Sequence, residues 1–168
     1  VIRRKTTEVE APVANEDLVT GLFNRHHFIE LMDKALGRSV QAGQAACLVF
    51  MRIDRQAALL ASNGLGGMDM VLADLATMLR EHFPKNAQLA RFSDDAFTAL
   101  LTDQAPSQTE PLLSALLKNV ETHLFDANGR TVQLTLSIGV ASLDEQTTRS
   151  QDIIDRAHRC ADSLKEGN

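Results

Sequence analysis

The chain has 168 residues and a formal net charge of −5, with 44% hydrophobic and 23% charged residues. These values are typical of one globular domain and exclude wholesale disorder. The excess of acidic residues argues against nucleic-acid binding. Tryptophan and tyrosine are absent, and the seven phenylalanines are expected in the core rather than on a surface where a single strand would stack.

The sequence carries no signal for membrane insertion or secretion. No run of about 18 apolar residues is present, and the basic start is followed by polar residues rather than by the apolar core of a signal peptide. Cys47 and Cys160 lie far apart and form no C-x-x-C pair, which predicts two buried, reduced thiols rather than a disulfide or a metal site. We therefore expect a piece of a longer cytoplasmic protein, with no contact between this domain and a membrane.

The first third of the chain is predicted to hold a linker, a helix and a strand. Residues 1–16 are mixed polar and are predicted to be a linker or the tail of a preceding domain, with the domain itself at 17–168. A turn-rich opening at 17–25 leads into apolar residues at helical spacing, which predict a helix that ends at Gly37. The apolar run at 45–53 predicts a buried strand.

The middle of the chain is predicted to contain two helices and a hairpin. Helical periodicity covers 56–60 and 68–83, and the glycine-rich stretch at 62–67 predicts a break between the two. Two short strands, at 88–92 and 96–101, are joined by Ser-Asp-Asp, which predicts a tight hairpin.

The last third adds a helix at 109–124, a half-buried strand with alternating apolar residues at 132–140, and a final helix at 150–165. Helices therefore alternate with strands and one hairpin along the whole chain. This order predicts an α+β fold of the ferredoxin-like kind, in which helices pack on an antiparallel or mixed sheet.

Four motifs lie in register along most of the chain. They read D-L-V-T-G-L-F-N-R at 17–25, R-F-S-D-D-A-F at 91–97, L-T-L-S-I-G-V-A at 134–141, and a last helix with Ala157, Ala161 and Lys165. They resemble D-x-L-T-G-L-x-N-R, R-F-G-G-D-E-F, V-T-x-S-I-G-V-A and A-D-x-A-L-Y-x-A-K of the GGDEF domain family, the bacterial diguanylate cyclases. The resemblance implies a nucleotidyl-cyclase-type central antiparallel sheet surrounded by helices. It also implies a place in cyclic di-GMP signalling, since active members join two GTP molecules into this product.

The same resemblance implies that the family's metal site is lost. The first strand of the family ends in D-x-D, and its first aspartate binds Mg²⁺, whereas this chain has Arg52 there. A fixed cation at that position opposes the binding of another cation. The hairpin motif keeps its acid at the third position and loses it at the fourth, in the sequence Ser93, Asp94, Asp95 and Ala96. We therefore expect no catalytic residue, no metal and no cofactor.

The hairpin residues also affect nucleotide binding. Ser93 and Asp94 replace two glycines, which adds side chains and a negative charge where a triphosphate would lie. Asp94 lies one residue before the retained acid, and in extended backbone its side chain would point to the opposite face. At the vacated metal position, we predict that the Arg52 guanidinium pairs with Asp95, with Asp54 as the competing partner.

Asp69, Asp95 and Lys165 are the candidates for a remnant of the nucleotide site. Asp69 matches an aspartate that reads the guanine base in the family, but the matching asparagine position is Leu60, which cannot hydrogen-bond. The product-inhibition motif R-x-x-D is replaced by Pro-Lys-Asn-Ala at 84–87. The five histidines have no metal-ligand spacing, and we interpret them as surface or helix-packing residues.

Three functions remain open at this point. The first is a catalytically inactive GGDEF domain that serves as a regulatory, dimerisation or signal-transmitting module in a multidomain bacterial protein. In such proteins the domain often precedes an EAL domain, which degrades or senses cyclic di-GMP, and twitching-motility regulators of the FimX type have this layout. The second is a GTP-binding module that tunes a neighbouring domain without turnover. The third is an active cyclase with an unusual motif. The implied partners are an EAL domain of the same chain and a second copy in a homodimer.

Overall fold

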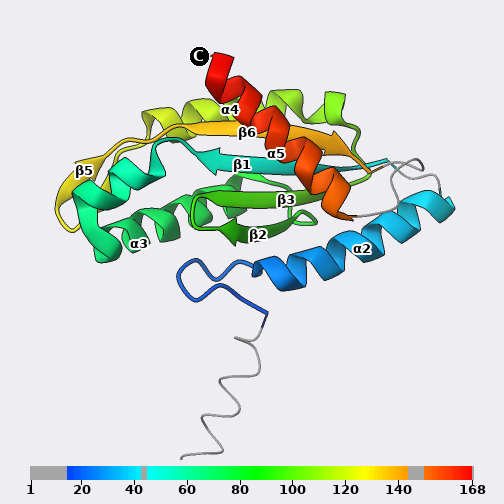
Figure 1. Ribbon diagram of the computed structural model, residues 1–168, viewed down its shortest axis with the longest axis horizontal. Helices are drawn as coiled ribbons and strands as arrows, with labels where there is room; N and C mark the ends of the chain where they lie inside the picture. The colour runs from blue at the N-terminus through cyan, green and yellow to red at the C-terminus, as the bar shows by residue number, and fades with distance from the viewer. Residues whose placement is uncertain (1–14, 43–44, 144–149, 168) are drawn as a thin grey trace, which may run out of the picture.

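A four-stranded antiparallel sheet forms the centre of the protein in the computed structural model, which describes residues 15–42, 45–143 and 150–167. The strand order is β2-β3-β1-β6 (Figure 1). In that order the strands span Gln88–Ser93, Ala96–Thr102, Ala46–Ile53 and Leu136–Ser142. Every neighbouring pair is antiparallel, which confirms the expected α+β fold with a central antiparallel sheet.

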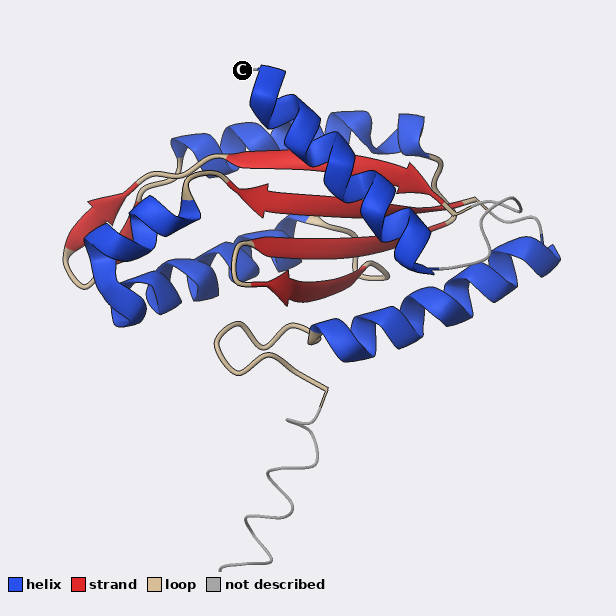
Figure 2. Ribbon diagram, viewed as in Figure 1, coloured by secondary structure: helices blue, strands red, loops and turns tan. Residues whose placement is uncertain are grey.

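Helices cover both faces of this sheet (Figure 2). On one face lie α2 (Arg25–Ala42) and α5 (Ser150–Gly167), and on the other lie α3 (Gln56–His82) and α4 (Pro106–Thr122). The central strand β1 therefore buries both of its faces. Leu48 and Phe50 belong to the cluster under α2 and α5, and Val49 and Met51 to the cluster under α3 and α4. Burial on both sides explains why this strand is a continuous apolar run in the sequence.

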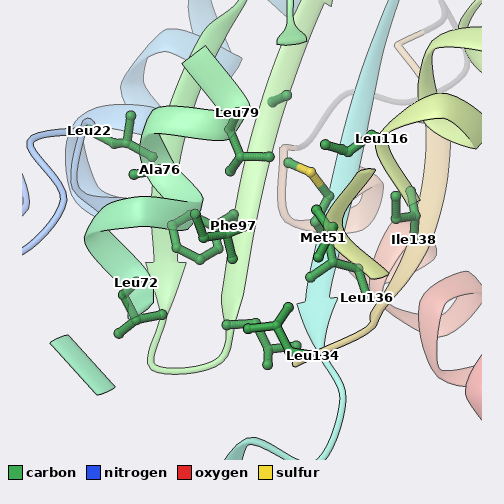
Figure 3. Packing of buried hydrophobic residues seen from close by; sticks show 14 of the residues in the cluster. Leu22, Met51, Leu72, Ala76, Leu79, Phe97, Leu116, Leu134, Leu136 and Ile138 are labelled. Carbon is green, nitrogen blue, oxygen red and sulfur yellow. The ribbon is translucent and has the colours of Figure 1, made fainter. Parts of the chain in front are cut away.

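The larger core cluster lies between the sheet and helices α3 and α4 (Figure 3). Leu72, Ala76 and Leu79 recur along α3 at spacings of four and three residues, so they form one stripe that faces Met51 and Phe97 of the sheet. All five residues are almost fully buried. The apolar stripe that predicted the second helical segment is therefore the face that builds the core.

Helix α5 approaches the sheet unusually closely at Gly139 of β6. A Cβ atom at this position would overlap the carbonyl oxygen of Ala157 and would lie 2.7 Å from the backbone nitrogen of Ala161. Both alanines are buried. Gly139 in the third motif and the two alanines in the fourth therefore lie against one another, and their small size allows the backbones of α5 and β6 to come into contact.

The opening motif forms a wide turn that joins the edge of the sheet. The Asp17 carboxylate accepts hydrogen bonds from the Thr20 amide (2.9 Å) and the Thr20 hydroxyl (2.8 Å), and it lies 3.6 Å from Nη1 of Arg91 in β2. Phe23 pairs with Ala90 as a parallel bridge: its amide donates to the carbonyl of Leu89 and its carbonyl accepts from the amide of Arg91. The motif thus fastens the start of the domain to the strand that carries the hairpin.

Two sequence predictions about helices need correction. Helix α2 does not end at Gly37 but continues to Ala42, because Gly37 is exposed and a single glycine weakens a helix without ending it. The two predicted helices at 56–60 and 68–83 form one element, α3, which bends at Gly64, the residue with non-helical backbone angles. The predicted break therefore exists as a kink rather than as a loop.

The strand predicted at 132–140 is wrong in its first half. Residues Arg130–Val132 form β5, which pairs with β4 (Phe125–Ala127) in a separate two-stranded sheet, and β6 begins only at Leu136. Asn128 and Gly129 make the turn between β4 and β5 with φ values of 55° and 89°. The Asn-Gly pair was a readable hairpin signal, but strands of three residues are too short to show an alternating pattern.

The two cysteines differ in their surroundings. Cys47 is buried in β1 as predicted. The predicted burial of Cys160 is wrong, because Cys160 is exposed on α5. The buried stripe of α5 contains Ile153, Ala157 and Ala161, and position 160 lies beside that stripe rather than on it. None of the described helices is both long and apolar enough to cross a membrane.

Candidate functional site

Arg52 and Asp95 form an ion pair where β1 ends beside the β2–β3 hairpin. Nε of Arg52 donates to Oδ2 of Asp95 over 3.2 Å, and the side chains are 26% and 31% exposed. The register places Arg52 opposite Ala96, so the end of β1 lies beside the turn. The predicted pairing of Arg52 with Asp95 is therefore confirmed.

Asp95 is held by three groups of the chain itself. Its Oδ1 accepts from the Ser93 hydroxyl (3.0 Å), its Oδ2 accepts from Arg52, and its backbone carbonyl accepts from the Ile53 amide (2.7 Å). Both carboxylate oxygens thus have partners within the chain. Because these partners come from β1 and from the hairpin, Asp95 fixes one to the other.

The hairpin turn tolerates side chains at the two positions where the family motif has glycine. In the described residues the non-glycine residues with positive φ are Arg55, Asp103 and Asn128, so neither Ser93 nor Asp94 adopts the left-handed backbone that favours glycine. Asp94 is exposed, and its backbone carbonyl accepts a hydrogen bond from Arg91. Ser93 and Asp94 therefore cost the turn no backbone strain.

Asp54, the predicted competitor for Arg52, is held by two hydroxyl groups. Thr135 donates to its Oδ2 (2.7 Å) and Ser137 to its Oδ1 (2.6 Å), while the Asp54 amide donates to the Thr135 carbonyl (3.0 Å). Sequence reasoning missed Thr135 and Ser137. They reach Asp54 through the register of β6 against β1, and residue types alone do not reveal that register.

The structure describes the side-chain surroundings of two of the three remnant candidates, Asp69 and Asp95. Asp69 is exposed on α3, and Leu60, which stands where the family has the base-reading asparagine, is partly buried against the larger core cluster. Lys165 belongs to α5, but its side chain lies outside the described part of the structure. Of the two candidates whose side chains the structure describes, Asp95 contacts Arg52 and Ser93.

The residues around Asp95 do not fit the divalent cation that the family resemblance implies. A divalent cation prefers several oxygen ligands, and this position offers one carboxylate that is already paired with a guanidinium and the methyl group of Ala96. Within the described residues, no group of three His, Cys, Asp or Glu side chains is arranged to hold a metal ion. The arrangement therefore resembles an internal ion pair more than a metal site.

The histidines contact neighbouring elements individually. His82 lies 2.6 Å from the Leu112 carbonyl, His123 lies 2.9 Å from the Asp74 carboxylate, and the His158 ring packs edge-on against Phe50. His26 pairs with Glu30 one turn along α2, and the His27 ring lies against Phe23. These contacts are those of surface and helix-packing residues, as interpreted from the sequence.

A cavity of about 540 Å³ lies next to Asp54. Ala58, Leu59 and Ser62 of α3 form one wall, and Gln133 and Thr135 lie in the segment between β5 and β6. The cavity also has Arg55 and Glu121 at its lining, so charges of both signs face it. Arg52, Asp95 and Asp69 are not among the residues that line it.

The comparison with known families accounts for nearly all of this chain. The family described as diguanylate cyclase, GGDEF domain, matches residues 14–168. The chain belongs to the GGDEF family. This membership confirms the resemblance inferred from the four motifs and gives the domain a place in cyclic di-GMP signalling.

Solved structures and curated proteins agree with this assignment. The GGDEF domain of FimX from Pseudomonas aeruginosa is 47% identical, with a TM-score of 0.88 over 92% of this GGDEF chain and 95% of the FimX chain. The probable diguanylate cyclase DgcE of Escherichia coli is 25% identical over 92% of this chain, and diguanylate cyclase A of Treponema denticola is 22% identical over 89%. The chain spans 14% of DgcE and 41% of diguanylate cyclase A, less than half of each protein.

Proposed function

We propose that this GGDEF domain makes no cyclic di-GMP and acts as a regulatory, dimerisation or signal-transmitting module. The observation that carries the proposal is the ion pair between Arg52 and Asp95. Catalysis of phosphoryl transfer by a metal ion requires carboxylates that hold the ion against the phosphate and the attacking oxygen. A guanidinium beside the one retained carboxylate, together with Ala96, leaves no such set of ligands.

The proposed setting is a multidomain cytoplasmic protein. The short span of this chain within its curated relatives supports further domains in the same polypeptide. An EAL domain is the neighbour we propose, and it would supply any phosphodiesterase activity of the whole protein. A second copy of the domain in a homodimer is the other proposed partner.

A second candidate function, GTP binding without turnover, draws on α3. Gly64 keeps a positive φ of 75°, and Asp69 keeps its carboxylate exposed on the same helix. A nucleotide held by these features would tune a neighbouring domain through binding alone. Isothermal titration calorimetry of the domain with GTP, with and without Mg²⁺, distinguishes this candidate from a module that does not bind GTP.

The main proposal is tested by incubating the purified domain at high concentration with GTP and Mg²⁺ or Mn²⁺. We expect no cyclic di-GMP above the level of a protein-free sample when products are measured by mass spectrometry. A product that increases in proportion to the concentration of the domain would overturn the proposal.

A double variant tests whether the loss of the two hairpin glycines alone prevents turnover. Ser93→Gly with Asp94→Gly restores the glycines of the hairpin and leaves Arg52 and Ala96 unchanged. This variant should also make no product, since a metal ion would still lack its carboxylates. Circular dichroism of both proteins shows whether the comparison is between folded samples.

A further inference from the structure

The start of α3, from Gln56 to Gly66, is packed differently from the rest of that helix. From Gln56 to Gly66 no residue is buried. From Gly67 onward the helix buries a regular stripe, namely Gly67, Met68, Val71, Leu72, Leu75, Ala76 and Leu79. One kinked helical element thus joins a loosely attached segment to a segment that is part of the core.

Both ends of the loose segment have non-helical backbone. Arg55 precedes it in the left-handed conformation (φ 58°, ψ 35°), and its side chain makes no capping hydrogen bond. Gly64 interrupts the helix with φ 75° and ψ 171°, a conformation that is accessible essentially to glycine alone. Figure 1 shows the bend of α3 at this place. Residues 56–63 are therefore a short helical piece between two joints.

Few contacts attach this piece to the domain. Leu59 and Leu60 pack, partly buried, against the larger core cluster. The Arg130 guanidinium of β5 donates to the Ser62 carbonyl over 2.5 Å. By contrast, the Asn63 side chain donates to the Leu59 carbonyl (2.8 Å), a bond within the piece itself. A segment with so few external contacts opens locally at a lower free energy than the core does.

The same piece forms one wall of the 540 Å³ cavity. Ala58, Leu59 and Ser62 face this space, and Glu121 of α4 and the segment 133–135 line it from the remainder of the domain. Local opening of the piece between its two joints, with loss of its helical hydrogen bonds, would widen the cavity without disturbing the buried stripe of α3.

We propose that residues 56–63 are a helical flap, hinged at Arg55 and Gly64, that opens and closes over this cavity while the rest of α3 remains fixed. The flap goes beyond the proposed function and does not depend on it, because its movement involves neither the metal position nor cyclase activity. It gives the domain a segment whose position a bound molecule or a neighbouring domain can change.

Hydrogen exchange of the intact domain, followed by mass spectrometry, tests the flap. Amides of residues 60–63 should exchange about a hundredfold faster than those of residues 72–79 in the same helix, because local opening needs less free energy than global unfolding. One uniform level of protection from Gln56 to His82 would overturn the proposal.

Arg130→Ala, with Thr131→Ala as its matched control, tests the attachment. Thr131 is exposed on the same strand as Arg130. Loss of the bond to Ser62 should raise the exchange of the flap amides about two- to fivefold and leave residues 72–79 unchanged. Thr131→Ala should change neither region. Equal acceleration throughout α3 in Arg130→Ala would show global loosening and would contradict a flap.

Discussion

At the scale of single residues, Arg52 affects stability and ion binding to very different extents. Its pair with Asp95 is about a quarter to a third exposed, and such pairs contribute only about 0–1 kcal/mol to folding. A divalent cation brought within about 4 Å of the guanidinium would meet a repulsion of several kcal/mol at an effective dielectric constant of about 20. We therefore expect the exclusion of metal ions to be the larger effect of this residue.

Replacing both residues at the metal position should restore metal binding. Mg²⁺ or Mn²⁺ should leave the melting temperature of the natural domain unchanged. In Arg52→Asp with Ala96→Glu, a tenfold excess of metal over its Kd should raise the melting temperature by about 3–6 °C. Arg52→Lys with Ala96→Glu is the control, because it keeps a positive charge and should show no rise. Differential scanning fluorimetry with and without EDTA measures all three, and a rise in the natural domain would contradict the exclusion.

The residue-level predictions from sequence succeeded where a contact follows from strand geometry. Arg52 lies near the end of β1 and Asp95 in the turn that leads into the adjacent strand β3, an arrangement that the family motifs imply, so their pairing could be predicted. The partners of Asp54 could not, because Thr135 and Ser137 reach it only through the register of β6. The exposure of Cys160 depends on which stripe of α5 faces the sheet, and that stripe is set by the contact at Gly139.

At the scale of elements, the contact of α5 with β6 depends on the absence of a side chain at Gly139. Gly139→Ala would place a methyl group against the backbone of α5, so the helix must shift. We expect a loss of about 2–4 kcal/mol in the free energy of unfolding, measured by urea denaturation.

Gly37→Ala is the matched control for this substitution. Gly37 is an exposed glycine inside α2, and no atom lies within 4 Å of the position that its Cβ would take. This change should raise stability by up to about 1 kcal/mol, since alanine is the better helix former. Equal effects at the two glycines would contradict the close packing of α5.

The wide turn at the start of the domain should loosen when its carboxylate is removed. Asp17→Ala deletes the acceptor for the amide and hydroxyl of Thr20 and the partner of Arg91. The Phe23 amide, which donates to Leu89, should then exchange faster, while amides of β1 should not. Leu18→Ala, a change at the exposed residue that follows Asp17, should leave the Phe23 amide unaffected.

Element prediction from sequence worked best for long apolar patterns. The central strand and the last helix carry many buried residues and were predicted to within a few positions. The β4–β5 hairpin was missed because its strands have three residues each. The end of α2 was misplaced because an isolated glycine signals a helix end only when the backbone turns there, and Gly37 stays helical.

At the scale of the whole molecule, the buried thiol of Cys47 links stability to alkaline pH. Burial raises the pKa of this thiol from 9.0 to about 11. Between these two values the unfolded chain has lost the proton and the folded chain still holds it. This contribution to stability is therefore fully present below pH 9 and is lost as the pH rises toward 11.

Denaturation curves at pH 8 and at pH 10.5 measure this loss. Between these two pH values the free energy of unfolding of the natural domain should fall by up to about 2 kcal/mol more than that of Cys47→Ala, in which the thiol is absent. A thiol reagent should modify Cys160 in the folded protein and Cys47 only in denaturant, because only Cys160 is exposed. Rapid modification of both thiols under native conditions would contradict the burial of Cys47.

The bridge between Phe23 and Ala90 has a consequence for the behaviour of the domain in concentrated solution. β2 is an outer strand of the sheet, and an outer strand without a partner offers its amide and carbonyl groups to other chains, which leads to aggregation. On that side, the backbone of Phe23 forms hydrogen bonds with the Leu89 carbonyl and the Arg91 amide. A domain shortened to begin after Asn24 would expose them. The first motif of the family thus also covers an edge strand that would otherwise pair with other chains. We expect a domain without this motif to precipitate.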